Sequence, residues 1–223
     1  MREARDRSGR MPYRLWYEEA EIDSIMEDEL RRAGSPHIGG AALDVDAFIE
    51  QHLGITPQFE ALPRGVQGAT DFFPDGRVEM RISAALSGLA AEGEPGAENL
   101  MRTTLAHEAA HVLLHRVLFL RQPEALFGRD TSRRELCRDV RPVGRAYSGE
   151  WWEWQANRGM GTLLMPRSEV VSHTQAERSA GHEDTGALIT SVADRFLVSR
   201  EAARLRLEQL AVRTDPHQVS WSF

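Results

Sequence analysis

The segment around residue 110 holds three residues whose types and spacing could do chemistry. His107 and His111 are separated by four positions, and Glu108 directly follows the first of them. On an α-helix, residues four apart project from one face, so the two imidazoles can fill two corners of a tetrahedral zinc site. Glu108 is rotated away from the two ligands and can reach a water on the metal instead. The spacing therefore predicts metal-dependent hydrolysis, with Glu108 as the base.

A helix is the element that must position these residues, and the surrounding sequence predicts one. Glycine and proline break the chain between residues 93 and 96, and Glu98 and Asn99 then offer acidic and capping side chains. The run from residue 100 to residue 118 contains neither glycine nor proline. Its inward face is expected to carry Leu100, Thr104, His107, His111 and Leu114. Histidines buried among leucines are held neutral, which is the form that a metal needs.

A catalytic zinc site takes a third protein ligand and leaves its fourth position for water. Glu153 is the predicted third ligand. It lies in a second predicted helix, which runs to Leu164 and stops before Pro166. Asn157 falls one turn later on the same face, where it could accept a hydrogen bond from a ligand histidine and fix its tautomer. Glu150 is the alternative third ligand.

Two further residues compete for a place at the metal. Cys137 is the only cysteine and follows the histidine pair, but a lone thiol flanked by arginine in a charged stretch is seldom a ligand. His115 continues the histidine series by one more turn. Three ligands on one straight helix would spread along about 12 Å of its axis, too far for one tetrahedral ion. We expect His115 to pack in the core or to support a ligand.

The two ligand segments occur in a specific order. The first runs from Arg102 to His115, the second reads Glu153-Trp154-Gln155-Ala156-Asn157, and Leu163-Leu164-Met165-Pro166 follows. In combination they resemble the ImmA/IrrE family of zinc metallopeptidases, and the likeness covers residues 40 to 212. Two departures concern packing. Gly159-Met160 stands where the family usually has Phe-Ala, and Ala109-Ala110 replaces the commoner Leu-Gly.

The resemblance implies a fold, a site and an activity. The fold is α+β, a mostly helical zincin-like core with a small antiparallel sheet and a C-terminal helical pair. At the site, His107, His111 and Glu153 are the zinc ligands and Glu108 is the catalytic acid/base. The implied activity is that of a cytoplasmic endopeptidase that cleaves a helix-turn-helix transcriptional repressor.

Composition limits the class of protein. A chain of 223 residues with 41% hydrophobic content can bury a core as one domain, with or without a small helical appendage. No apolar run approaches the roughly 20 residues of a membrane span, and the arginine-rich N-terminus does not read as a secretory signal. The single cysteine favours a reducing cytosol. A formal net charge of −7 argues against general nucleic-acid binding.

The rest of the chain reads as a tail, a peptidase domain and a helical subdomain, over residues 1–12, 13–166 and 167–223. The tail is predicted to be disordered, and helices are predicted over 13–32, 45–53, 168–178, 186–196 and 199–212. A hairpin is predicted at Pro74-Asp75-Gly76. Its second strand, Arg77 to Ile82, is a candidate edge strand that could align an extended substrate by main-chain pairing.

Two questions stay open at the level of sequence. Tyr147, His173 or His182 could supply the donor that stabilises the oxyanion. A rival function is that of a zinc-stabilised or metal-free regulator that binds a repressor or DNA through its C-terminal helices without cutting. Few basic residues lie on those helices beyond Arg200, Arg204 and Arg206, which favours packing over DNA reading. A deformylase-like enzyme is disfavoured, because its thiolate ligand is expected before the histidine pair, where no cysteine occurs.

Overall fold

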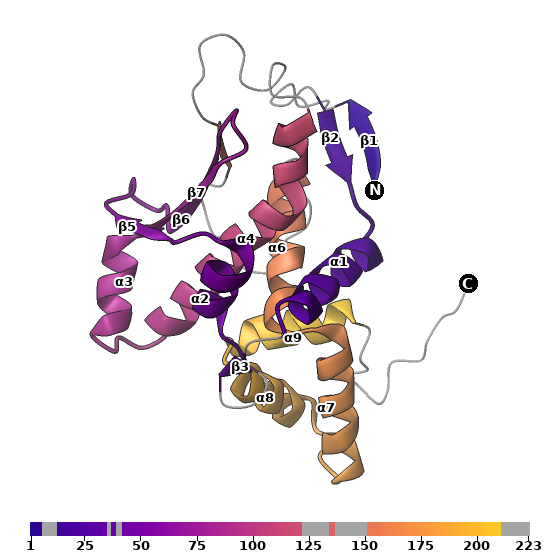
Figure 1. The fold of residues 1–223 in the computed structure, drawn as a ribbon. Coiled ribbons are helices and arrows are strands. Elements are labelled where there is room, and N and C mark those ends of the chain that lie inside the picture. Colours follow the sequence, from indigo (N-terminus) through magenta and orange to yellow (C-terminus); the bar gives the residue numbers. More distant parts are fainter. Residues whose placement is uncertain (6–12, 35–36, 39–41, 122–133, 137–150, 211–223) are drawn as a thin grey trace.

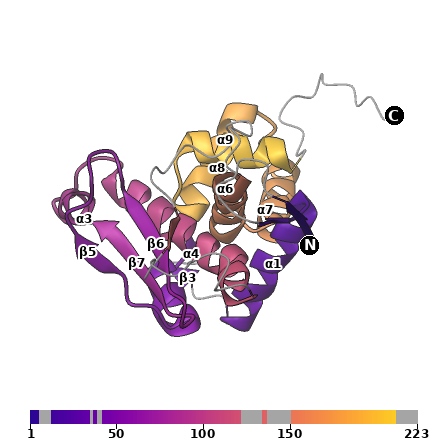
Figure 2. The same cartoon turned by 90° about the horizontal axis from the view of Figure 1, so that it is seen from above.

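The computed structural model describes residues 1–5, 13–34, 37–38, 42–121, 134–136 and 151–210. The fold is α+β and mostly helical, as predicted. Two helices pack side by side at its centre, α4 (Ala97–Arg121) and α6 (Trp151–Leu164), as Figure 1 shows. Seen from above in Figure 2, the sheet covers one side of α4, and α6 with the C-terminal helices lies on the other.

Helix α4 begins directly after Gly96, whose φ of +79° is a conformation that glycine adopts without strain. The helix therefore starts before the predicted cap Asn99, and Glu98 lies in its first turn. The predicted inward face is confirmed for four buried residues, Thr104, His107, His111 and Leu114. The prediction is wrong for Leu100, which is 39% exposed. Leu100 precedes Thr104, the residue at which the continuous run of buried side chains on α4 begins.

The sheet that covers α4 has the strand order β5-β7-β6-β8 among the described strands. Strands β6 (Gly68–Phe72) and β7 (Val78–Ser83) form the predicted antiparallel hairpin, with Gly76 at φ +83° in its turn. Strand β5 (Gln58–Glu60) runs parallel to β7, so the sheet is mixed rather than purely antiparallel. Strand β8 (Arg134–Leu136) pairs antiparallel with β6 and brings Leu136 opposite Thr70.

The prediction that Arg77 to Ile82 forms an edge strand is wrong. Strand β7 lies between β5 and β6, so both of its edges already carry main-chain hydrogen bonds. The edges of the described sheet are β5 and β8 instead. Strand β5 was not predicted from the sequence. It is short and all three of its residues are exposed, so it lacks the alternation of buried and exposed side chains that indicates a strand.

The N-terminus also differs from expectation. Strand β1 (Arg2–Arg5) pairs with β2 (Tyr13–Trp16), so the predicted disorder is wrong for residues 2–5, and residues 6–12 lie outside the described part. The predicted helix from Tyr13 begins only at Glu19, as α1 (Glu19–Arg32). Leu15 and Tyr17 are buried and Trp16 stacks on Trp154 of α6, with ring centroids 5.8 Å apart. Because Leu15 and Tyr17 point to the buried face and Trp16 points to the other, the two-residue period of a strand fits this segment.

Short elements complete the N-terminal half. The predicted helix over 45–53 is confirmed as α2 (Val45–Ala47) and the π-helical η1 (Phe48–Leu53), and Asp44 caps it by accepting a hydrogen bond from the Ala47 amide. Before it, β3 (His37–Ile38) pairs with β4 (Ala42–Leu43). Helix α3 (Ala84–Ala91) follows β7 and packs on α4.

Three helices follow Pro166, close to the predicted ranges: α7 (Arg167–Ser179), α8 (Thr185–Phe196) and α9 (Arg200–Gln209). Leu197 turns the chain between α8 and α9 with φ 51°, and Ser199 caps α9 by accepting from the Ala202 amide. A buried ion-pair network ties these helices to the core. Asp23 of α1 contacts Arg158 of α6 and Arg206 of α9.

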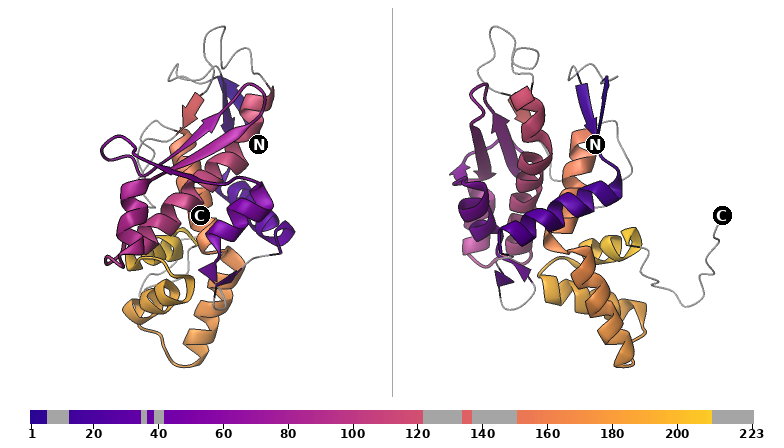
Figure 3. Two further views of the ribbon diagram at one scale, coloured as in Figure 1. Left: turned by 60° about the vertical axis from the view of Figure 1, so that its left-hand side comes forward. Right: turned by 45° about the vertical axis from the view of Figure 1, so that its right-hand side comes forward.

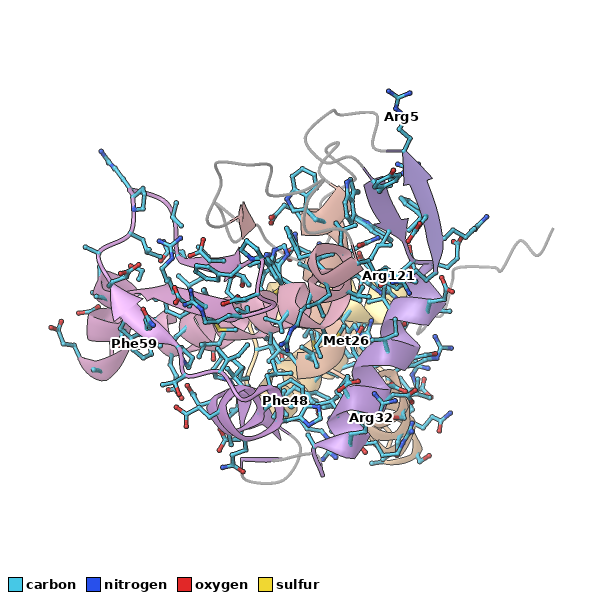
Figure 4. The ribbon with its side chains drawn as sticks, turned by 45° about the horizontal axis from the view of Figure 1, so that its top comes forward. Arg5, Met26, Arg32, Phe48, Phe59 and Arg121 are labelled. Atoms are coloured by element: carbon cyan, nitrogen blue, oxygen red, sulfur yellow. The ribbon has the colours of Figure 1, made fainter. Side chains whose placement is uncertain are left out.

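The hydrophobic core lies between α1, α4, α6 and the inner face of the sheet. Figure 4 places Met26 and Phe48, both fully buried, among the crowded interior side chains, whereas Arg5 projects outward from the end of β1. In the right-hand view of Figure 3, the sheet, α4 and α6 follow one another as layers. Among the described helices, none is both long and apolar enough to cross a bilayer.

Candidate metal centre

Helices α4 and α6 bring together the three side chains that were predicted from the sequence to be metal ligands. The Nε2 atoms of His107 and His111 are 3.0 Å apart. Glu153 of α6 places Oε2 3.3 Å from His107 Nε2 and Oε1 3.4 Å from His111 Nε2. Ligand atoms held about 2.0–2.1 Å from a tetrahedral zinc ion lie roughly 3.3 Å from one another. The donor set and the size of this triangle therefore fit a zinc-sized cation.

Burial and charge act together in this cluster. Both histidines are fully buried, and the side chain of Glu153 is 12% exposed. Burial alone would raise the pKa of Glu153, but the two histidines outweigh it and hold that pKa well below its usual range. Burial likewise would lower the pKa of His107, yet Glu153 raises it overall. The carboxylate thus draws positive charge into the triangle, which a divalent cation would supply directly.

Glu108 lies on the same helix and faces the sheet. Its side chain is fully buried, and the Thr70 hydroxyl of β6 donates a 2.7 Å hydrogen bond to Oε2. The other oxygen, Oε1, has no hydrogen-bond partner among the described residues. Burial raises the pKa of Glu108, which brings a carboxylate closer to the range of a working base. Thr70 thus fixes Oε2 of Glu108, while Oε1 can accept a hydrogen bond from a reacting group.

Gly68 is the second β6 residue at this carboxylate. A Cβ atom at position 68 would lie 2.7 Å from Glu108 Oε1 and 2.8 Å from Thr104 Cγ2. Any larger residue would therefore push against the Glu108 carboxylate. The strand approaches α4 this closely because position 68 has no side chain.

The remaining polar neighbours surround the histidines. Asn157, one turn after Glu153, lies against His107 and favours its charged form. His115 is buried one turn after His111 with 3.0 Å between their Nδ1 atoms, and burial lowers the pKa of His115 to about 3. His115 is therefore neutral at physiological pH. It lies beside His111 and is not one of the three candidate ligands.

A sequence model of the IrrE N-terminal-like domain, the peptidase M78 family, matches residues 97–208. The chain belongs to this family. No curated protein matches the sequence. The matched range begins at the start of α4 and ends within α9, so it contains His107, Glu108, His111 and Glu153. This membership makes the protein a metallopeptidase of the ImmA/IrrE type.

The two packing departures from the IrrE-like pattern compensate each other. A Cβ atom at Gly159 would lie 2.9 Å from Cβ of Ala110 and 3.4 Å from Leu114 Cδ1. Helices α4 and α6 thus touch at a glycine and an alanine, where a larger residue would separate them. Met26 of α1 reaches the same point, since its Cε lies 3.4 Å from that Cβ position. The small pair keeps α4 and α6, which carry the candidate ligands, close together.

Several predicted candidates lie away from the cluster or outside the described residues. Cys137, Tyr147 and Glu150 fall in a range that the structure does not describe. His173 of α7 bonds Ser191 of α8 through Nε2 at 2.8 Å, and His182 pairs with Glu177 at 2.9 Å. Both histidines are thus engaged by the C-terminal helices. The identity of the oxyanion donor stays a prediction.

The sequence assigned no role to Gly68 and Thr70, which contact Glu108, or to Gln155, whose Oε1 lies 3.0 Å from His115 Nε2. Strand β6 carried a hairpin signal, but nothing in it indicates which residue meets Glu108, 38 positions later along the chain. Gln155 follows Glu153 by two positions and therefore faces another direction on α6. A signal could have been found in the small residue Gly68, because an interior glycine in a strand often marks a close approach.

Proposed function

We propose that this IrrE-like protein is a zinc-dependent endopeptidase. The observation that carries the proposal is the meeting of His107, His111 and Glu153 in one ligand-sized triangle, with Glu108 buried on the same helix. Zinc is the proposed cation because two imidazoles and one carboxylate, with a fourth position left over, form the ligand set of many catalytic zinc sites.

The mechanism assigns a part to each side chain. His107, His111 and Glu153 would hold the cation, which supplies Lewis acidity toward the scissile carbonyl and a nearby water. Glu108 accepts the proton of the attacking water through Oε1, which no described residue engages, and passes it to the leaving amine nitrogen. The Thr70 hydroxyl holds Oε2 meanwhile, so the carboxylate keeps one orientation through both proton transfers.

The proposed substrate is a helix-turn-helix transcriptional repressor, and the proposed place of action is the cytoplasm. The support is family resemblance for the substrate and the single cysteine for a reducing compartment. The geometry of the site is suited to peptide hydrolysis in general.

The rival function is that of a non-catalytic regulator that binds a repressor or DNA through α8 and α9. Two of the three arginines on α9 are already engaged. Arg206 is buried, where it donates to the Met165 carbonyl and pairs with Asp23. Arg204 pairs with Glu201 and Glu208 along the helix. These contacts favour a packing role for α9.

Replacement of Glu108 by Gln separates the two functions. The variant keeps the three ligands and the steric fit at β6 but removes the proton acceptor, so it should retain zinc and lose cleavage. New protein N-termini are compared by mass spectrometry between cells of the source organism that carry the wild type and cells that carry Glu108→Gln. We expect wild-type-dependent cuts in a helix-turn-helix protein. Identical N-termini in both strains, with equal zinc content, would contradict the peptidase function.

A further inference from the structure

We infer that His115 and Gln155 select the tautomer of His111 and so turn its Nε2 lone pair toward the metal position. The inference rests on the proposed metal site. It concerns positioning residues, because neither side chain enters the ligand triangle. Three hydrogen bonds in series connect the backbone of β2 to His111.

The hydrogen bond farthest from His111, between Gln155 and Leu15, determines which atom donates at each later step of the series. The Gln155 amide nitrogen lies 2.7 Å from the Leu15 carbonyl oxygen, which can only accept. Gln155 Oε1 therefore faces His115, and it lies 3.0 Å from His115 Nε2. Because an amide oxygen also only accepts, His115 must carry its proton on Nε2.

The remaining proton positions follow from neutrality. His115 is fully buried and therefore neutral, so a proton on Nε2 leaves Nδ1 as an acceptor. His115 Nδ1 lies 3.0 Å from His111 Nδ1 and must accept from it. His111 then carries its proton on Nδ1, which leaves the lone pair of Nε2 free to face His107 and Glu153. That lone pair is the one that a metal needs.

Packing holds each member of the series in place. Trp151 lies edge-on to the His115 ring with centroids 5.5 Å apart, and Gln155 is fully buried. Strand β2 is itself fixed to α6, because Trp16 stacks on Trp154 at an interplanar angle of 4°. The N-terminal hairpin, which precedes the range matched by the family, thus takes part in building the metal site.

Two variants of Gln155 test the inference because tautomer selection and packing predict opposite orders. Gln155→Glu, which burial keeps protonated, still offers an oxygen acceptor to His115 Nε2–H and an O–H donor to the Leu15 carbonyl, whereas Gln155→Leu removes both and is better suited to an apolar surrounding. Loss of such a partner weakens metal binding by about 10–100-fold. We therefore expect Gln155→Leu to bind Zn²⁺ 10–100-fold more weakly than wild type in chelator competition, and Gln155→Glu to stay within a few-fold of it.

Gln175→Leu alters an exposed glutamine of α7 and should leave Zn²⁺ affinity unchanged. Nitrogen-15 chemical shifts of labelled histidine should show His111 protonated at Nδ1 in the wild type and not in Gln155→Leu. If Gln155→Leu binds Zn²⁺ as well as wild type, or better than Gln155→Glu, the inference is overturned while the metal site stands. If wild type binds no Zn²⁺, the proposed function fails first.

Discussion

The Thr70 hydroxyl donates a 2.7 Å hydrogen bond to Oε2 of Glu108, so a strand residue orients the proposed base on helix α4. Both residues are fully buried, and burial makes a hydrogen bond to a carboxylate more effective than it is in water. The sheet therefore acts on the chemistry of the site as well as covering the helix.

Replacement of Thr70 by Val should slow peptide hydrolysis without loss of zinc. Valine keeps the shape of threonine but removes the donor, and a hydrogen bond to a charged group is worth about 1.5–3 kcal/mol. We expect kcat/KM to fall about 10–100-fold, measured with the cleaved protein substrate. Thr70→Ser keeps the hydroxyl and should stay near the wild type. A Val variant of full activity would show that the bond has no part in orienting Glu108.

Replacement of Gly68 by Ala should displace the Glu108 carboxylate. The new methyl group would lie 2.7 Å from Oε1 and 2.8 Å from Thr104 Cγ2, so the base must move or the strand must retreat. We expect loss of hydrolysis and a lower free energy of unfolding, by about 1–3 kcal/mol in urea titrations. Gly88→Ala is the matched control, because nothing lies within 4 Å of its Cβ position on α3. That control should be neutral or slightly stabilising.

Zinc should stabilise the folded protein, and Glu153 should be required for this effect. A ligand that binds only the native state at 100 times its Kd adds about 2.7 kcal/mol. We expect Zn²⁺ to raise the Tm of the wild type, EDTA to reverse the change, and Glu153→Ala to abolish it. Glu150→Ala should respond like the wild type. If metal binding is lost only in Glu150→Ala, the assignment of Glu153 is incorrect.

Replacement of Asp23 by Asn should destabilise the fold without touching the metal cluster. Asp23 is the counter-charge of Arg206, whose side chain is fully buried, and of Arg158, and removal of one partner of a buried pair costs about 3–5 kcal/mol. Urea unfolding at pH 7 measures the change. Glu19→Gln removes a second carboxylate that pairs with Arg158, but Glu19 is 60% exposed, so that control should change stability by about 1 kcal/mol or less.

The same network predicts a dependence on acid. Burial raises the pKa of Asp23, but hydrogen bonding by Arg158 and the charge of Arg206 outweigh it, so the pKa lies below its usual value. The stabilisation is therefore complete above the unfolded pKa of about 3.9 and is lost as the pH falls through the lower, folded pKa. Between pH 5 and pH 2, the wild type should lose stability more steeply than Asp23→Asn. Parallel curves would argue against the shift.

Local spacing determined much of the proposed centre. His107 and His111 share a face because they are one helical turn apart in a stretch without glycine or proline, and Glu153 lies on a helix that ends before Pro166. Asp44 and Ser199 start their helices through their own side chains. These features depend on residues a few positions apart, so they can be predicted from the local sequence.

Contacts between distant elements were decided only by the tertiary structure. Strand β5 makes β7 an interior strand, Trp154 holds a hairpin at the N-terminus, and Thr70 and Gly68 meet Glu108 across 38 and 40 positions. Gln155 finds the Leu15 carbonyl 140 positions away. The periodicity of apolar residues in a helix or strand predicts which of its faces is buried. Which element packs against that face depends on how all the elements fit together in the core.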